Sequence, residues 1–185
     1  MTYALKPTSD ARERPVLLPG LSERAAIEDL RRRLVRYAVK LIWNRDDAEE
    51  LVQEALQLAI AKQIPPRDKR FGPWAFRTVG NLSLNLRRRS KPEPLGGWIE
   101  PTTGESPEGR MERIEELERV RTAISSLPDQ QRIAIVLRME QQMDYADIAG
   151  IMELSESAVR GHVHQARRSL IAACPRDGRP MGGRK

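Results

Sequence analysis

A stretch rich in Pro, Gly, Ser and Thr runs from Ser90 to Gly109 and divides the chain into two parts. Its sequence, SKPEPLGGWIEPTTGESPEG, has the composition of a linker. A chain of 185 residues holds one medium domain or two small ones, and a central linker favours two. Aromatic residues make up only 4% and charged residues 31%, which suits small domains with large solvated surfaces.

Apolar residues recur every three or four positions on both sides of this linker, and no strand-like alternation appears, so we expect an all-α fold. The first part predicts a helix from Leu21, a second from about Asp46 as N-cap to Lys62, and a third from Pro73 or Trp74 to Arg89. The second part predicts an amphipathic helix whose inner face carries Met111, Ile114, Leu117, Val120, Ile124 and Leu127, then a helix opened by Pro128. The expected division is 1–20 N-terminal extension, 21–91 first domain, 92–110 flexible linker, 111–173 second domain and 174–185 flexible tail.

The segment from Asp144 to Leu170 has the pattern of a helix-turn-helix. Ile148, Ala149 and Met152 give the first helix an inner face, and Ser155 is a suitable N-cap for the second. The inner stripe of the second helix is Val159, Val163, Ala166 and Leu170. Its polar face would enter a major groove N-terminus first, with side chains for base edges and phosphates. The competing interpretation is a helical hairpin with a solvated basic face.

Two smaller features of this segment have their own alternatives. Gly161 either permits close approach of a DNA backbone or is simply tolerated within the helix. His162 and His164 lie two positions apart, and on a helix they point in different directions, so a metal site is disfavoured.

The helix predicted before the linker, FGPWAFRTVGNLSLNLRRRS, combines aromatic, amide and arginine side chains. This mixture suits single-stranded or melted nucleic acid, whose unstacked bases are held in pockets. The alternatives are that Trp74 and Phe76 are core residues and that the arginine run is a solvated helix end favoured by the helix dipole.

The stretch RDDAEELVQEAL, from Arg45 to Leu56, concentrates acid in a chain of net charge +6. Its apolar face is Ala48, Leu51, Val52, Ala55 and Ala59, and acids and amides occupy the rest. Taken alone, this pattern indicates a solvated helix face. Because two basic segments with DNA-binding features lie in the same chain, the acidic pattern favours a basic protein partner.

The order of these parts resembles the extracytoplasmic-function (ECF) group of bacterial sigma-70 family factors. DDAEELVQEAL, FGPWAFRTVGNLSLNLRRR, a linker, ISSLPDQQRIAIVLR and a helix-turn-helix follow one another over about residues 25–172. The resemblance implies two helical domains corresponding to sigma regions 2 and 4. It also implies a promoter-specificity subunit that binds core RNA polymerase and promoter DNA, needs no cofactor, and is held inactive by an anti-sigma factor.

The resemblance assigns three sets of site residues. The set expected on the clamp helices of the polymerase β′ subunit is Asp47, Glu49, Glu50, Gln53 and Glu54. The set expected to recognise and melt the −10 element is Arg67, Lys69, Arg70, Trp74, Arg77, Asn81, Asn85 and Arg88. The set expected to read the −35 element is Ser155, Ser157, Arg160, Gly161, His164, Arg167 and Arg168, on a domain that also contacts the β flap. The acidic segment 96–119, of net charge −4, would mimic nucleic acid near the RNA exit channel.

Other classes of protein fit less well. A single cysteine, Cys174, excludes a disulfide framework and a Cys-rich zinc site. There is no apolar run long enough to span a bilayer and no signal peptide, so a cytoplasmic protein is expected. We find no catalytic triad spacing, phosphate loop or metal set, and therefore expect no enzyme. A helix-turn-helix repressor or activator is the alternative function, but it leaves the acidic helix and the helix before the linker without roles.

Overall fold

The computed structural model describes residues 21–89 and 106–174, and within these ranges the chain is helical with no strand. The seven described helices are α1 (Leu21–Ile42), α2 (Arg45–Ala61), α3 (Phe71–Arg89), α4 (Pro107–Ser126), α5 (Asp129–Met139), α6 (Tyr145–Met152) and α7 (Glu156–Ala173). The all-α prediction is confirmed. The N-terminal extension, most of the linker and the tail beyond Cys174 lie outside the described residues.

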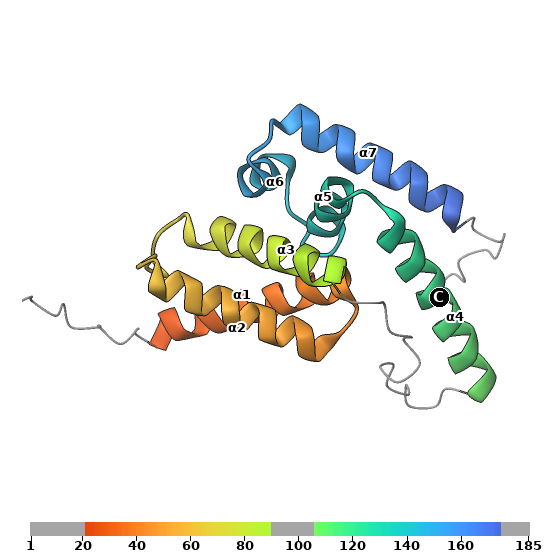
Figure 1. Cartoon of the computed structure of the whole chain (residues 1–185), viewed down its shortest axis with the longest axis horizontal. Coiled ribbons are helices and arrows are strands. Elements are labelled where there is room, and N and C mark those ends of the chain that lie inside the picture. The colour runs from red at the N-terminus through yellow and green to blue at the C-terminus, as the bar shows by residue number, and fades with distance from the viewer. Residues whose placement is uncertain (1–20, 90–105, 175–185) are drawn as a thin grey trace, which may run out of the picture.

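Helices α1, α2 and α3 pack together in pairs and form the first helical domain (Figure 1). The predicted periodicity of α1 is borne out by Leu34 and Tyr37, which are fully buried. Tyr37 meets Phe76 of α3 edge to face, with ring centroids 5.5 Å apart. Such pairs add to the free energy gained from burial alone. Phe76 is therefore a core residue, which agrees with the interpretation that this aromatic side chain packs inside the protein and does not hold a base.

Two helix starts differ from the sequence prediction. The N-cap of α2 is Asn44 rather than Asp46, and its side-chain oxygen accepts a hydrogen bond from the backbone N–H of Asp47 at 3.1 Å. Asn and Asp are equally good N-caps, and the extended backbone of Asn44 decides between them. Helix α3 begins at Phe71, so Pro73 falls within its first turn. Backbone N–H groups in the first turn have no partner within the helix, so proline, which lacks an N–H, is tolerated there.

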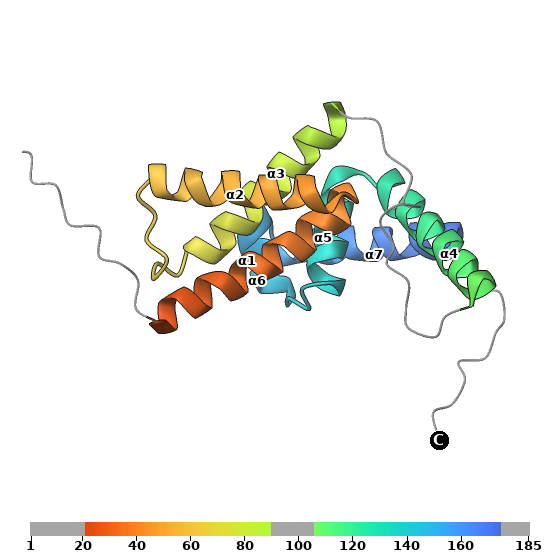
Figure 2. The same cartoon turned by 90° about the horizontal axis from the view of Figure 1, so that it is seen from below.

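Helices α4 to α7 form the second domain, with α4 extending away from the rest (Figure 2). Helix α4 begins at Pro107, inside the range 92–110 predicted as linker, because Ser106 caps it by accepting from Gly109 N–H at 3.1 Å. Met111 is 63% exposed and does not share the predicted inner face. The half-buried residues of α4 that gather around the buried Trp43 of the first domain are Ile114, Leu117, Val120 and Ile124.

The two domains also pack directly on each other, α3 against α6 and α1 against α5 (Figures 1 and 2). Gly80 marks a close approach within this region. A Cβ built on Gly80 would lie 2.7 Å from the Tyr37 hydroxyl and 3.7 Å from Cδ1 of Ile133 in α5. Glycine is required there because the hydroxyl of a fully buried tyrosine has little room to move.

A buried guanidinium holds α4 and α5 together. Arg132 is 1% exposed, and it donates to the carbonyl oxygens of Ile124 and Ser125, both at 2.9 Å, and to that of Leu127. It also pairs with Asp129 at 3.2 Å. Burial, together with the charge of Arg87, lowers the pKa of Arg132 to about 10, although Asp129 opposes both effects. The guanidinium therefore stays charged at neutral pH and satisfies the carbonyls at the end of α4.

We expect Arg132→Lys to destabilise the protein by about 2 kcal/mol, because a single ammonium cannot reproduce a planar fork of donors and leaves buried carbonyls unpaired. The measurement is urea unfolding followed by circular dichroism. Arg168→Lys, on the exposed face of α7, is the matched control and should change the free energy of unfolding by less than about 0.5 kcal/mol. Equal stability of both variants would contradict this role of Arg132.

Candidate functional site

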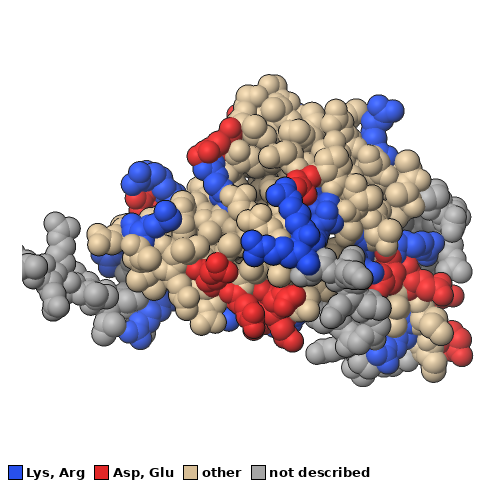
Figure 3. All heavy atoms as spheres, in the orientation of Figure 1, with Lys and Arg blue, Asp and Glu red and all other residues tan. Residues whose placement is uncertain are grey.

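The first candidate surface lies on α2. The predicted apolar face is confirmed, since all five of its residues are buried. On the opposite side, residues at helical spacing form an exposed row, here called the acidic stripe, made of Asp46, Glu50, Gln53, Glu54 and Gln57. Figure 3 shows acidic side chains gathered over α2, close to basic side chains at the end of α3. The helix therefore presents negative charge to solvent in a fixed geometry.

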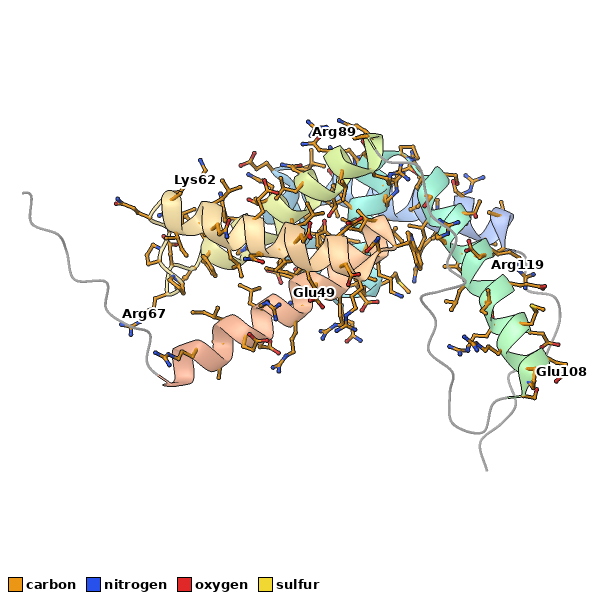
Figure 4. The ribbon with its side chains drawn as sticks, turned by 60° about the horizontal axis from the view of Figure 1, so that its bottom comes forward. Glu49, Lys62, Arg67, Arg89, Glu108 and Arg119 are labelled. Atoms are coloured by element: carbon orange, nitrogen blue, oxygen red, sulfur yellow. The ribbon has the colours of Figure 1, made fainter. Side chains whose placement is uncertain are left out.

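Two residues of the predicted polymerase-binding set stand apart from the acidic stripe. Asp47 is half-buried, and its backbone N–H is held by Asn44. Glu49 accepts a hydrogen bond from Nε of Arg45 at 3.0 Å, and Figure 4 shows it on the half of α2 far from Lys62 and Arg67. An exposed ion pair of this kind contributes little free energy, so Glu49 can exchange its partner. Asp46 belongs to the stripe, although the predicted polymerase-binding set does not include it.

The second candidate surface lies on α3. Side chains at spacings of four, four and three residues share one face and form a row, here called the α3 stripe, made of Arg77, Asn81, Asn85 and Arg88. Asn81, Asn85 and Arg88 are exposed, whereas Arg77 is half-buried. Trp74 is half-buried and packs against the core, so only part of its ring surface is open. The structure thus brings the amides and arginines together and gives the tryptophan a share in the packing.

The loop before α3 adds Arg67, Lys69 and Arg70, all exposed. Arg70 forms a fork with Asp68, with Nη2 to Oδ2 at 2.7 Å and Nε to Oδ1 at 3.1 Å. Hydrogen bonding from the Arg70 side chain lowers the pKa of the Asp68 carboxyl to about 2. Asp68 was not singled out from the sequence. An Asp in a loop is nevertheless a signal for a turn in which its carboxylate binds the residue two positions later, here Arg70. DNA would have to compete with this carboxylate for Arg70.

The third candidate surface is the outer face of α7. Ser155 is the N-cap, as predicted, and accepts a hydrogen bond from Ala158 N–H at 3.2 Å. The predicted inner stripe is borne out by Val159, Val163 and Ala166, which are buried, and by Leu170, which is half-buried. All seven residues of the predicted −35 set are exposed. The helix-turn-helix therefore offers one continuous polar face.

Arg160 has two neighbours that the sequence did not reveal. Its guanidinium carbon lies 4.3 Å from the ring centroid of Tyr145, the first residue of α6, and its Nη2 lies 3.4 Å from Oε2 of Glu156. Arg138 approaches the same ring at 4.9 Å. Stacking of this kind limits the directions that an exposed arginine samples. No local pattern signals it, because Tyr145 and Arg160 lie in different helices.

Gly161 has open space around it. A Cβ built there meets no atom of the described chain within 4 Å, so internal packing does not require glycine at this position. Glycine within a helix costs about 1 kcal/mol relative to alanine.

We therefore expect Gly161→Ala to raise the free energy of unfolding by about 0.5–1 kcal/mol and to weaken binding of promoter duplex, because the added methyl group stands on the DNA-facing side. Thermal unfolding measures the first effect and fluorescence anisotropy with duplex DNA the second. Gly150→Ala on α6, also without neighbours, is the control for stability alone. Unchanged duplex affinity would favour the interpretation that Gly161 is merely tolerated.

The described residues offer no group of three or more His, Cys, Asp or Glu side chains arranged to hold a metal ion. Among the described helices, none has both the length and the apolar character needed to cross a membrane.

One helical domain carries a helix-turn-helix and the other an amide- and arginine-lined helix, an arrangement suited to a two-domain protein that binds nucleic acid. Comparison with known families specifies the class. Residues 26–93 match the sequence profile of sigma-70 region 2, and residues 117–170 match that of sigma-70 region 4. The chain belongs to the extracytoplasmic-function group of the sigma-70 family.

Individual relatives agree with this assignment. The chain is 32% identical to the ECF RNA polymerase sigma factor EcfG of Rhodopseudomonas palustris (strain TIE-1) over 158 residues, which cover 83% of each protein. Its fold is similar to that of the sigma factor RpoE in complex with the anti-sigma factor NepR from Bartonella quintana, with a TM-score of 0.64, 23% identity, and coverage of 84% of this chain and 98% of that one. CnrH in complex with the cytosolic domain of CnrY is similar at a TM-score of 0.60 and 23% identity, covering 82% and 86% of the two chains.

The chain is accordingly an alternative sigma factor, a non-enzymatic subunit that directs core RNA polymerase to promoters. The match to region 2 as well as region 4 removes the alternative of a simple helix-turn-helix repressor or activator.

Proposed function

We propose that the three candidate surfaces divide the work of promoter recognition. The acidic stripe of α2, with Asp47 and Glu49 at its margin, binds the β′ clamp helices of core polymerase. Support comes from the rigid display of carboxylates on a helix whose other face is fully buried. An acidic surface repels DNA and attracts a basic protein, so it complements the basic surfaces around it.

The α3 stripe and the loop residues Arg67, Lys69 and Arg70 bind the −10 element. Amides offer donors and acceptors to unstacked bases, and arginines hold the phosphates between them. Asn81 and Asn85, both exposed and one helical turn apart, are suited to the bases. Arg77 and Arg88 lie at the two ends of the same row.

The outer face of α7 reads the −35 element in a major groove. Ser157, Arg160 and His164 lie where base edges are within reach, whereas Arg167 and Arg168 suit phosphates. The stacking of Arg160 on Tyr145 limits the directions that its guanidinium samples before DNA binds. The second domain also meets the β flap.

Control by an anti-sigma factor is the fourth part of the proposal. It is supported by two structurally similar sigma factors that form complexes with NepR and CnrY. The protein acts in the cytoplasm, where core polymerase and promoter DNA are found.

The observation that carries the proposal is the presence, in one chain, of an acidic helix face, an amide- and arginine-lined helix and a recognition helix. The test is runoff transcription with purified core polymerase on fragmented host DNA, followed by mapping of start sites. We expect discrete starts only when both protein and core are present. An operator-like footprint from the protein alone, with no core-dependent initiation, would contradict it.

Replacing Glu50 and Glu54 with Ala should lower affinity for core polymerase by about tenfold or more, because two exposed carboxylates are lost from the middle of the acidic stripe. Far-UV circular dichroism should remain unchanged, since neither side chain packs in the core. Native gel shift or biolayer interferometry with core polymerase gives the affinity.

The matched control is Glu28→Ala with Asp29→Ala, which removes two exposed carboxylates from α1 that pair with Arg31 and Arg32 of the same helix. This control should bind core as the wild type does. If both double variants lose affinity equally, net charge and not the acidic stripe governs binding.

A further inference from the structure

With the exception of a hydrogen bond from the Gln141 amide to the Arg33 carbonyl oxygen, the polar contacts described between the two domains are donated by the first. The donors are arginines of the first domain, Arg33 and Arg36 on α1 and Arg77, Arg87 and Arg88 on α3. Their acceptors are carbonyl oxygens, carboxylates and one amide oxygen of the second domain. Figure 4 shows Arg89, which directly follows Arg88, at the end of α3.

Arg77 is held at the turn of the helix-turn-helix. Its Nε donates to the carbonyl oxygen of Ile151 at 2.7 Å and its Nη2 to that of Gly150 at 3.3 Å. Its Nη1 pairs with the carboxylate of Glu153. The carbonyls lie at the C-terminal end of α6, the negative end of the helix dipole.

Arg87 and Arg88 are held at the junction of α4 and α5. Nη1 of Arg87 donates to the Ser125 carbonyl oxygen at 2.7 Å, again at a helix C-terminus, and Nη2 of Arg88 pairs with Asp129 at 2.6 Å. Burial raises the pKa of Asp129, but hydrogen bonding by Arg88 and the charges of Arg132, Arg88 and Arg87 outweigh burial and lower it. The carboxylate therefore stays ionised at neutral pH.

The α1 side adds weaker contacts. Arg36 lies 3.8 Å from Glu140, and Arg33 and Gln141 exchange two hydrogen bonds at 3.3 and 3.4 Å. Between the two domains, Arg77 and Asn81 also line a cavity of about 180 Å³ together with Ile133 and Met152.

These contacts place the second domain over part of the α3 stripe. Helix C-termini and carboxylates offer arginines the same chemistry as a DNA backbone, namely oxygen acceptors carrying negative charge. Arg77 and Arg88 cannot hold their present partners and DNA phosphates at once. The outer face of α7, by contrast, remains exposed in the same structure.

We propose that this packing is a self-masked state, in which α5, α6 and their flanking turns occupy the −10 surface until the domains separate. The proposal rests on the assignment of the α3 stripe to the −10 element. It adds a control within the chain itself, independent of any second protein. Masking is reversible, because the pairs of Arg77 and Arg88 include well-exposed groups, Glu153 at 76% and Arg88 at 66%, whose attraction is modest and screened by salt.

The test uses the full chain with Glu140→Gln and Glu153→Gln, which remove two of the carboxylates with little change in side-chain size. Asp129 is left in place because it also pairs with Arg132. Fluorophores on Ile60→Cys and Ile171→Cys, one in each domain and both more than 70% exposed, report the distance between domains in a Cys174→Ser background. Binding of a fluorescent single-stranded DNA of mixed sequence reports access to the α3 stripe.

We expect lower energy transfer in the double variant than in the wild type, and about three- to tenfold tighter binding of single-stranded DNA at low salt. Raising the salt concentration should lower energy transfer in the wild type toward the value of the variant. Core-dependent transcription should stay within about twofold, because bound polymerase holds the domains apart in either protein.

The control is Glu28→Gln with Asp29→Asn, which changes the net charge equally at carboxylates that pair with Arg31 and Arg32 within α1. Equal energy transfer in wild type and double variant at every salt concentration would overturn the proposal. So would domain separation without a gain in DNA affinity, or an equal gain in the control. Absence of core-dependent initiation by the wild type would instead defeat the proposed function and leave the energy-transfer result standing.

Discussion

The charged guanidinium of Arg132, buried where α4 and α5 meet, is the interaction on which the contacts of the end of α3 with the second domain depend. It satisfies carbonyl oxygens at the end of α4 that would otherwise lie unpaired inside the protein. It also fixes Asp129 and the Ser125 carbonyl in place, and these are the acceptors that Arg88 and Arg87 use. The buried cation Arg132 thus sets the geometry in which the half-buried Arg87 and the exposed Arg88 are held.

The fold separates its charges by helix. Helix α2 buries small apolar side chains and shows carboxylates, whereas α3 shows amides and arginines, and α7 shows serine, histidine and arginine. Each surface lies on a helix whose opposite face is packed, so its side chains are presented by a rigid backbone. A sigma factor must contact a protein and DNA at once, and opposite charges on adjacent helices keep those two contacts from competing for one surface.

Local features of the sequence predicted local features of the structure well. The buried faces of α2 and α7 and the Ser155 cap follow from spacing and side-chain chemistry within one helix. The sequence predictions were wrong where neighbouring residues compete for one structural position, or where a contact joins residues far apart in the sequence. Asn44 displaced Asp46 as N-cap, and Met111 lies outside the face that packs around Trp43. The partners of Arg77 and the Tyr145 ring that stacks on Arg160 lie outside the helices of these arginines, so no sequence period encodes them. Side-chain chemistry pointed to nucleic acid for residues of the third helix and of the helix-turn-helix, whereas the −10, −35 and core-polymerase roles come from the resemblance, and those roles stay predictions.

Arg77 and Arg87 both donate to backbone carbonyls rather than to side chains of the second domain. Backbone acceptors persist when side chains are exchanged, provided that the helix ends in the same place. The recognition residues on α7 can therefore be redesigned, or a whole second domain grafted from a relative, without erasing these two contacts. A chimeric factor with new −35 specificity should keep the same hydrogen bonds between its two domains. The scaffold is therefore suitable for building sigma factors that recognise promoters of their own.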